Sequence, residues 1–368
     1  MIMIDYRPTS EQSLMRASLS AFLTDHQSPQ GDAGLRSYWK TLAETLGIQR
    51  LLLPEHLGGF GGHVRDGAII AEEIGKALSP APFTETIMLC ANILERANNA
   101  AQIVEAVASG DCLLALAHSE IGARCNIASV SSTATRRGAG FALSGLKTCV
   151  APSAADQIIL SARTSGEERD KNGITLFLAP AASLKDAASY TCFDGGSALE
   201  VRLDNHYVDD AQVIGEVDHG YSLLAPAYER ATIGACAEGV GVMSAMLQQT
   251  LEHVQTRKQF GKPLSALQAI RHGLVDMLLA IEKAQSLTQH AAIAFESAEI
   301  DFKATSAAKV AVNRALRFVS QSAVQFHGAI GTTQELPLSN YFKRATALSF
   351  AYGDTEHHLA RYAAIMRP

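Results

Sequence analysis

The residue pattern of the chain changes twice along its length, and this order limits the folds that the chain can adopt. Up to residue 111, apolar residues recur at helical spacing, as in SEQSLMRASLSAFLTDH, where Ser10 and Glu11 predict a helix start. Short apolar runs such as CLLALAHS and QIILSART then alternate with Gly and polar residues, which is typical of a β barrel or sandwich. Helical spacing returns after residue 210. We therefore expect a mainly α protein with a central β domain: an N-terminal helical domain (1–111), a middle β domain (112–210) and a C-terminal helical bundle (211–368).

Two apolar faces in the last region are long enough to pack against other helices. Both repeat at intervals of about 3.6 residues. The first consists of Ile233, Ala237, Val240, Met243, Leu247, Leu251 and Val254. The second consists of Leu264, Leu267, Ile270, Leu274, Met277 and Ile281. With the helical segments that follow, they predict a four-helix-like bundle.

Charge and cysteine placement exclude several classes of partner. The formal net charge is −6, the pI is near 6.1 and the basic residues are scattered singly, so there is no basic stripe for nucleic acid. Apolar runs end well before about 18 residues and the N-terminus is acidic, which predicts no membrane segment and a cytoplasmic location. The cysteines lie far apart and lack metal-ligand spacing, so neither a metal site nor a disulfide framework is expected.

Two stretches of the last region combine Gly with side chains that can bind a polar ligand. RKQFGKPLSALQ joins two helices through Gly and Pro, with Arg257 before the break and Gln268 after it. QFHGAIGTTQELP places Gly328 near Gln325, so that a backbone could approach a ligand closely. Each stretch alone is equally compatible with an ordinary helix connection.

In this order and at this separation, the two stretches resemble motifs of the acyl-CoA dehydrogenase family of flavoproteins. PEHLGGFGG is similar to the family's Pro-Glu-x-x-Gly-Gly segment, and the β domain and the C-terminal bundle fall where the family has them. The resemblance covers the whole chain. It implies the family's three-domain architecture, FAD as the cofactor, and an oxidoreductase that acts on the CH–CH bond of an acyl-CoA.

The resemblance also implies how FAD is held. In the family, residues of one subunit grip the FAD that lies mainly on its neighbour. Here these residues would be Arg257, Phe260, Gln325 and Gly328, and Gln268 would also reach the cofactor. An arginine suits a pyrophosphate because its planar fork can donate to two oxygens at once. A shared cofactor implies an obligate dimer, most often doubled to a tetramer.

The β domain departs from the family pattern at two places. HSEIGARCN takes the place of the family's Thr-Glu-Pro-Gly-Ala-Gly-Ser-Asp loop, and Cys149 stands where a Trp normally covers the flavin edge. Ser119 and the backbone amides around Val150 and Ala151 remain available to the isoalloxazine ring.

The usual catalytic base of the family is absent from its usual place. Matching RATALSFAYGDT to the family's Tyr-Glu-Gly-Thr turn puts Gly353 on the catalytic Glu and Thr355 on the flavin-side Thr. LAPAYERATIG resembles the segment in which isovaleryl-CoA dehydrogenases carry a relocated base just before an arginine, and here this pair is Glu229 and Arg230. We therefore expect Glu229 to be the base, with Asp354 as the alternative.

The expected reaction is the α,β-dehydrogenation of an acyl-CoA to the trans-2-enoyl-CoA, in fatty acid or sterol side-chain catabolism. The resemblance implies that Glu229 takes the α-proton, that FAD accepts the hydride, and that the Gly353 N–H and a flavin ribityl hydroxyl bind the thioester oxygen. The missing side chain at Gly353 leaves room beside the α-carbon, which predicts a branched or bulky acyl group. An electron-transfer flavoprotein is the expected acceptor.

Two other functions are compatible with the same fold. The altered β-domain loop would suit a non-catalytic or half-site subunit of a heteromeric acyl-CoA dehydrogenase, paired with a paralogous subunit. Asp354 as the base would suit a nitroalkane-oxidase-like or monooxygenase-like flavoenzyme. The fold alone does not decide among them, because function resides in the site.

Overall fold

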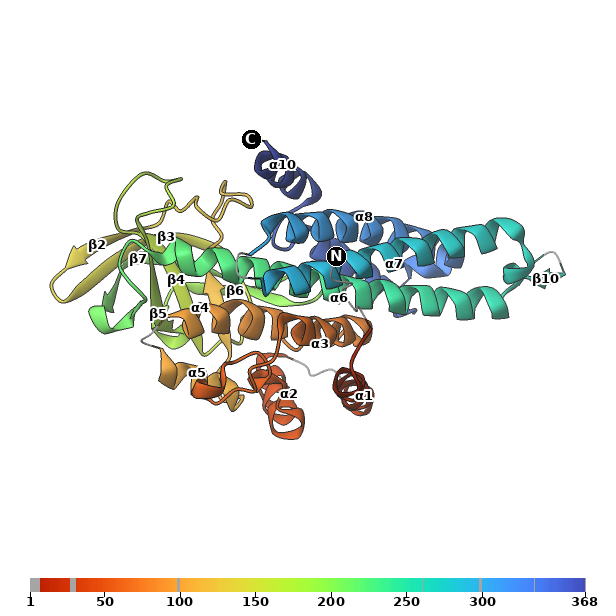
Figure 1. Ribbon diagram of the computed structural model, residues 1–368, viewed down its shortest axis with the longest axis horizontal. Coiled ribbons are helices and arrows are strands. Elements are labelled where there is room, and N and C mark those ends of the chain that lie inside the picture. The colour runs from red at the N-terminus through yellow and green to blue at the C-terminus, as the bar shows by residue number, and fades with distance from the viewer. Residues whose placement is uncertain are drawn as a thin grey trace. The chain divides into compact units, whose positions relative to one another are not determined.

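The computed structural model describes residues 7–26, 31–97, 100–259, 261–297, 300–333 and 335–367. They belong to two compact units (Figure 1). The bundle unit consists of Met1–Gln27, Val64–Ser79 and Thr232–Pro368, and the sheet unit consists of Ser28–His63 and Pro80–Ala231. The prediction of a mainly α protein with a central β domain is confirmed. The three domain boundaries stay a prediction.

The bundle unit is helical. Its helices are α1 (Ser10–Asp25), α3 (Val64–Ala77), the part of α6 (Gly220–Thr256) from Thr232 onward, α7 (Gln268–Phe295), α8 (Phe302–His327), α9 (Leu338–Phe350) and α10 (Thr355–Met366). Between α6 and α7 lie the hairpin strands β9 (Lys258–Gln259) and β10 (Lys262–Pro263) and the 3-10 turn η6 (Leu264–Ala266). A second 3-10 turn, η7 (Gly328–Thr332), follows α8.

The first helix begins at Ser10, and the residue that caps it is Thr9. Thr9 is the N-cap of α1, and its hydroxyl accepts the N–H of Gln12 at 3.2 Å. The Gln12 side chain in turn accepts the Thr9 N–H at 3.0 Å, which completes a capping box. Leu19 and Phe22 are buried, whereas Leu14 is exposed. The buried face of α1 therefore does not include Leu14.

The predicted apolar faces of the bundle are largely buried. In α6, Ile233, Val240 and Val254 are buried, and α7 buries its predicted residues from Leu274 onward. Leu264 lies in η6, ahead of the first residue of α7. Helices α7 and α8 pack along each other, as Figure 1 shows. Among the described residues, no helix is both long and apolar enough to cross a membrane.

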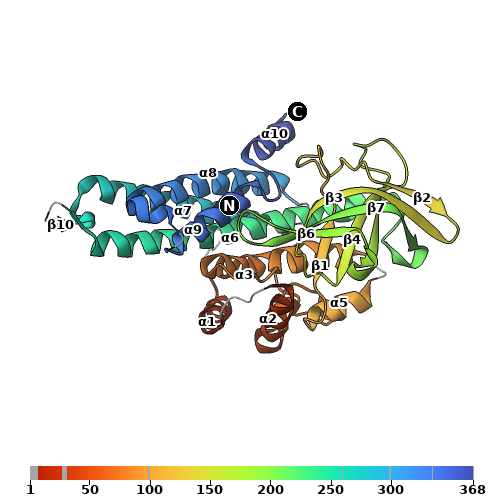
Figure 2. The ribbon, with the colours of Figure 1, turned by 180° about the vertical axis from the view of Figure 1, so that it is seen from behind.

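The described strands of the sheet unit form one eight-stranded sheet. The strands are β1 (Leu114–Ala117), β2 (Thr133–Arg137), β3 (Gly140–Val150), β4 (Gln157–Arg163), β5 (Ile174–Pro180), β6 (Ala187–Thr191), β7 (Ser197–Asp209) and β8 (Val213–Ile214). Their order is β6-β7-β3-β2-β4-β5-β8, with β1 paired in parallel to β4. Figure 2 shows β1, β4, β6 and β7 from behind. The long β3–β7 pair has two register shifts, which alter the alternation of side chains near the end of β3.

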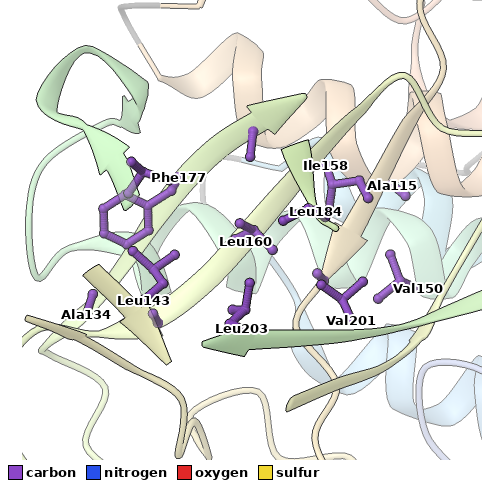
Figure 3. Packing of buried hydrophobic residues seen from close by; sticks show 14 of the residues in the cluster. Ala115, Ala134, Leu143, Val150, Ile158, Leu160, Phe177, Leu184, Val201 and Leu203 are labelled. Atoms are coloured by element: carbon purple, nitrogen blue, oxygen red, sulfur yellow. The ribbon is translucent and has the colours of Figure 1, made fainter. Parts of the chain in front are cut away.

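One large hydrophobic cluster of the sheet unit is formed by buried side chains of these strands. Figure 3 shows Leu143, Leu160, Phe177 and Val201 within it. The ring of Phe177 meets that of Phe141 edge-to-face at 5.3 Å between centroids. Burial of these side chains provides the rigid support for the loops at the strand ends.

Helical segments from the first part of the chain also belong to the sheet unit. They are α2 (Gly31–Leu46), η1 (Ile48–Arg50), η2 (Glu55–Leu57), the π-helix η3 (Thr84–Ala91), α4 (Asn92–Arg96) and α5 (Ala101–Ala108). The π-helix is rich in buried residues, among them Ile87 and Met88. A π-helix is rare in proteins and is found frequently at functional sites.

Candidate active site

In the sheet unit, the loop after β1 is held by a buried ion pair. The carboxylate of Glu120 accepts the backbone N–H groups of Ser131 and Ser132 at 2.6 and 3.0 Å. Lys147 of β3 is fully buried and donates to the same carboxylate at 2.5 Å. Burial alone would raise the pKa of Glu120, but Lys147 and the serines lower it to about 2. The charged carboxylate therefore fixes the path of the loop.

A chain of hydrogen bonds and one ring contact connects this ion pair to Ser119, the predicted flavin contact. Lys147 donates to the hydroxyl of Ser161 on β4 at 3.2 Å, and this hydroxyl lies 2.9 Å from His118 Nδ1. The ring of His118 meets the ring of Tyr228 at 5.5 Å between centroids. The hydroxyl of Tyr228 is hydrogen-bonded to Ser119, whose side chain is exposed. The flavin loop and the start of α6 are thus joined within the sheet unit.

The end of β3 carries the other predicted flavin contacts. Val150 is buried and paired with Leu199 of β7, whereas Ala151 follows the strand and is partly exposed. Cys149 is exposed, has φ of +55°, and donates its N–H to the hydroxyl of Tyr190 at 3.0 Å. This edge therefore presents a small thiol where the family has an aromatic ring.

The predicted base lies on the first part of α6. Glu229 is 2% exposed, and the neighbouring Leu224 and Ala225 are buried as well. A carboxylate that is buried to this extent is kept from bulk water, which suits a group that must take a proton from carbon.

Arg230, beside the predicted base, is directed toward η3. Its Nε donates to the carbonyl of Met88 at 2.9 Å and its Nη2 to that of Ile87 at 2.7 Å. Its Nη1 donates to Glu95 at 3.1 Å, and the side chain is almost completely buried. Arg230 therefore ties α6 to the π-helix, and a role in catalysis through this contact stays a prediction.

In the bundle unit, the predicted oxyanion turn is held at both of its peptide groups. Gly353 has φ of +118°, which side chains with a Cβ rarely adopt. Its N–H donates to the carbonyl of Phe350 at 3.3 Å, and its carbonyl accepts from Asn313 at 3.4 Å. The buried Lys309 donates to the Asn313 side chain at 2.8 Å, so this side of the turn is braced from α8.

The space predicted beside Gly353 is filled on the side where a Cβ would lie. An added Cβ would stand 2.5 Å from His358 Nε2 and 2.9 Å from His357 Cδ2. Non-bonded atoms do not approach so closely, so position 353 cannot carry the family's Glu in this conformation. The expectation of vacant space is wrong on this side, because the two histidine rings occupy it.

Asp354 and Thr355 form the start of α10. Asp354 is the N-cap, and its Oδ1 accepts the N–H of His357 at 2.8 Å. Thr355 is the first helical residue and is partly exposed. The carboxylate predicted as the alternative base thus accepts a backbone N–H that has no partner within the first turn of the helix.

The predicted FAD-gripping residues lie near one end of the bundle unit. Arg257 follows α6, Gln268 begins α7 and Gln325 lies near the end of α8, and all three are exposed. The ring of His253 stacks on that of His327 at 4.3 Å between centroids, which holds the ends of α6 and α8 together.

Gly328 stands at the same end, directly after α8. It has φ of +68°, and a Cβ built there would meet no atom within 4 Å. The space beside its backbone is therefore open to a ligand. Phe260 lies outside the described residues.

Sequence reasoning missed the residues that hold these segments in place. They are His118, Lys147, Ser161 and His358. Only Lys147 carries a signal in the sequence: it stands four residues after the inward Leu143, and this even spacing puts both on the same face of a strand. The others meet their partners through tertiary structure.

Comparison with known proteins assigns the family. The acyl-CoA dehydrogenase N-terminal domain matches residues 9–111, and the acyl-CoA dehydrogenase C-terminal domain matches residues 219–366. The chain belongs to the acyl-CoA dehydrogenase family. It is therefore an oxidoreductase that acts on acyl-CoA, with FAD as its cofactor.

Three relatives show how far the likeness extends. The acyl-CoA dehydrogenase IpdE2 of Mycobacterium tuberculosis is 26% identical over 351 residues, with 92% of each chain covered. Butyryl-CoA dehydrogenase of Megasphaera elsdenii superposes with a TM-score of 0.89 at 23% identity, covering 99% of this chain and 100% of that one. A variant of the Tcur3481–Tcur3483 steroid ACAD has a TM-score of 0.83 at 25% identity, covering 97% of both chains.

The residues of this acyl-CoA dehydrogenase fit FAD. The backbone at Gly328 is open. The exposed guanidinium of Arg257 and the exposed amides of Gln268 and Gln325 can form hydrogen bonds with a pyrophosphate and other polar groups of a dinucleotide. Arg257 and Gln325 would hold the cofactor there. In the sheet unit, Ser119 and Ala151 would contact the isoalloxazine ring.

Proposed function

We propose that this acyl-CoA dehydrogenase uses Glu229 as its catalytic base and converts an acyl-CoA into the trans-2-enoyl-CoA. A contrast between positions carries the proposal. Glu229 is a buried carboxylate, whereas Gly353 has neither a side chain nor the space for one. Asp354, the other acidic candidate, is engaged as the cap of α10.

The reaction requires one group for the α-proton and another for the thioester oxygen. Glu229 would take the proton, because it is an almost completely buried carboxylate, and a carboxylate can act as a general base. The Gly353 N–H would donate to the thioester oxygen, where negative charge grows as the proton leaves. FAD supplies the hydride acceptor for the β-hydrogen. Arg230 would act by positioning, since its bonds to η3 and Glu95 fix the turn of α6 that carries Glu229.

We further propose a branched or ring-bearing acyl group. The likeness to the steroid ACAD supports this proposal. The missing side chain at Gly353 does not support it, because two histidine rings occupy the space beside that residue. Comparing kcat/KM for straight-chain, 2-methyl and ring-bearing acyl-CoAs tests this preference. A clear advantage for the straight chains would overturn it.

We propose an assembly of at least two subunits, with an electron-transfer flavoprotein as the acceptor. The grip on FAD inferred from Arg257 and Gln325 needs a neighbouring subunit, and α7 exposes apolar side chains that suit a subunit contact. These are Val275, Leu278 and Leu279. Sedimentation of wild type and Leu279→Glu tests the assembly: the variant should shift toward monomer, and an unchanged mass would exclude this face.

The visible spectrum of the purified protein is the first test, because bound FAD makes a protein yellow. Acyl-CoAs of several classes are then added without oxygen to wild type, Glu229→Gln and Asp354→Asn. Asn is as good an N-cap as Asp, so the last variant removes the charge and keeps the cap. We expect wild type and Asp354→Asn to be bleached and Glu229→Gln to stay yellow.

Other outcomes would contradict the proposed base. If Glu229→Gln bleaches at the wild-type rate, Glu229 is not the base. If Asp354→Asn is the only variant whose flavin is not bleached, and the reduced wild type reoxidises rapidly in oxygen, the nitroalkane-oxidase-like or monooxygenase-like alternative is favoured.

A half-site subunit is the second candidate, supported by the flavin edge. Cys149 is exposed there, and the Ser119 hydroxyl is bonded to Tyr228. A protein that purifies colourless and gains FAD only with a paralogous subunit would support this candidate.

A further inference from the structure

His358 is a buried histidine beside the turn that carries Gly353. Its Nε2 lies 3.0 Å from the carbonyl oxygen of Tyr352, and its Nδ1 lies 3.4 Å from Ser306 Oγ on α8. Its ring also fills the space that a side chain at position 353 would need. The ring thus connects α8, α10 and the turn within the bundle unit.

The contact with Tyr352 determines which nitrogen of His358 carries the proton, because a carbonyl oxygen can only accept and Nε2 must therefore donate. The contacts of Ser306 agree with this assignment. Arg361 Nε donates to Ser306 Oγ at 2.8 Å, and an arginine can only donate. The hydrogen of the Ser306 hydroxyl is therefore free to point at His358 Nδ1, which then accepts. Burial lowers the pKa of His358 to about 3, so the ring is neutral and has one hydrogen. That hydrogen lies on Nε2 and is donated to Tyr352.

The carbonyl that His358 holds belongs to the same peptide as the Gly353 N–H. A trans peptide is planar, and its C=O and N–H point in opposite directions. Fixing the oxygen of Tyr352 therefore fixes the direction of the Gly353 hydrogen. This matters here because Tyr352 has φ of +56° and Gly353 of +118°, so the turn depends on outside support to keep its conformation.

We propose that His358 is a positioning residue that orients the Gly353 N–H toward the thioester oxygen of the substrate. The inference rests on the proposed function, which assigns that N–H to the oxygen. The bond from the Gly353 N–H to Phe350 is long, at 3.3 Å, and N–H groups at helix ends commonly serve two acceptors. Gly353 has no side chain that could hold this peptide group, and the ring of His358 holds it instead.

The test compares ligands that differ only in the thioester oxygen. Crotonyl-CoA and a ring-bearing 2-enoyl-CoA are titrated into the FAD-loaded enzyme, each beside the S-alkenyl-CoA thioether of the same carbon skeleton. Variants are His358→Gln, His358→Asn and His358→Leu. The Gln amide nitrogen can reach the place of Nε2, whereas the Asn amide reaches only that of Nδ1, so the two amides form a matched pair.

We expect His358→Asn and His358→Leu to bind both thioesters about fivefold more weakly than wild type, the effect of about one hydrogen bond. Thioether affinities should stay unchanged, and His358→Gln should restore most of the thioester affinity. A residue that only stabilises the fold would change thioester and thioether binding alike.

Three outcomes would overturn the inference. Equal losses for thioester and thioether would make His358 merely structural, and no loss in any variant would make it dispensable; both leave the proposed function intact. If wild type binds neither class of CoA ligand, the proposed function falls and the inference with it. Thermal melting of each variant shows that the compared proteins are folded.

Discussion

Gly353 illustrates how one residue can decide which mechanism a site can use. Its φ of +118° and the two histidine rings beside it both exclude a side chain. The loss of the family's base at this position is therefore matched by His357 and His358, which stand in its place. A single reverse substitution should not restore the usual arrangement.

We predict that Gly353→Glu destabilises the protein and does not rescue Glu229→Gln. Backbone strain alone costs about 1–3 kcal/mol, and displacement of His358 adds to it. Urea denaturation measures the loss of unfolding free energy, and anaerobic bleaching measures rescue. Ala360→Glu, on the exposed side of α10, is the control and should be close to neutral. Wild-type stability in Gly353→Glu would show that the turn is more adaptable than this geometry implies.

At the scale of elements, glycines allow α3 and α6 to cross at very close range within the bundle unit. A Cβ on Gly241 would lie 1.9 Å from the carbonyl oxygen of Glu72, and one on Gly75 would lie 2.2 Å from that of Glu238. The obstacle in each case is backbone, which cannot move aside like the end of a side chain.

We predict that Gly241→Ala lowers the unfolding free energy by about 1–3 kcal/mol through overpacking. Gly239→Ala, two residues earlier in the same helix, is the matched control. Its Cβ would meet only side-chain atoms, at 3.0 Å and beyond, so repacking and the better helix propensity of Ala should leave a smaller loss. Chemical denaturation of both variants checks the order, and a larger loss for Gly239→Ala would contradict it.

The Glu120–Lys147 pair connects the sheet to the predicted flavin loop. We predict that Lys147→Met costs about 3–5 kcal/mol, because Glu120 would be left buried without its partner. Adding Glu120→Gln should recover part of that loss. Denaturation of the single and double variants measures the effect, and the FAD content of each shows whether the loop keeps its shape. A double variant less stable than Lys147→Met would refute this explanation.

Periodicity explains why the elements could be predicted and the links between them could not. Ile233 to Val254 recur at helical spacing, and Leu143 and Lys147 share a strand face, so local sequence carries both features. His118, Ser161 and Tyr228 come from three separate segments and meet only after folding. The motifs located Glu229 and Gly353, but the histidines that fill the space beside Gly353 were visible only in three dimensions.

For the whole molecule, buried neutral histidines make stability depend on pH. Burial lowers the pKa of His118 in the sheet unit and of His358 in the bundle unit to about 3. In the unfolded chain both titrate near 6.5, so the unfolded state takes up protons first as pH falls. Stability present above pH 6.5 is therefore lost progressively toward pH 3. Glu120, with its pKa lowered to about 2, adds a further loss below about pH 4.5.

We predict that the unfolding free energy is lower at pH 5.5 than at pH 7.5, by about 1.4 kcal/mol for each of the two histidines. Urea denaturation at both pH values checks the sign and the size. His358→Gln cannot take up a proton and should lose less stability between the two pH values than wild type does, whereas the exposed His56→Gln should behave like wild type. Since each histidine lies in a different unit, acid should weaken both units over the same range. A wild type whose unfolding free energy is the same at both pH values would mean that these rings already accept protons in the folded state.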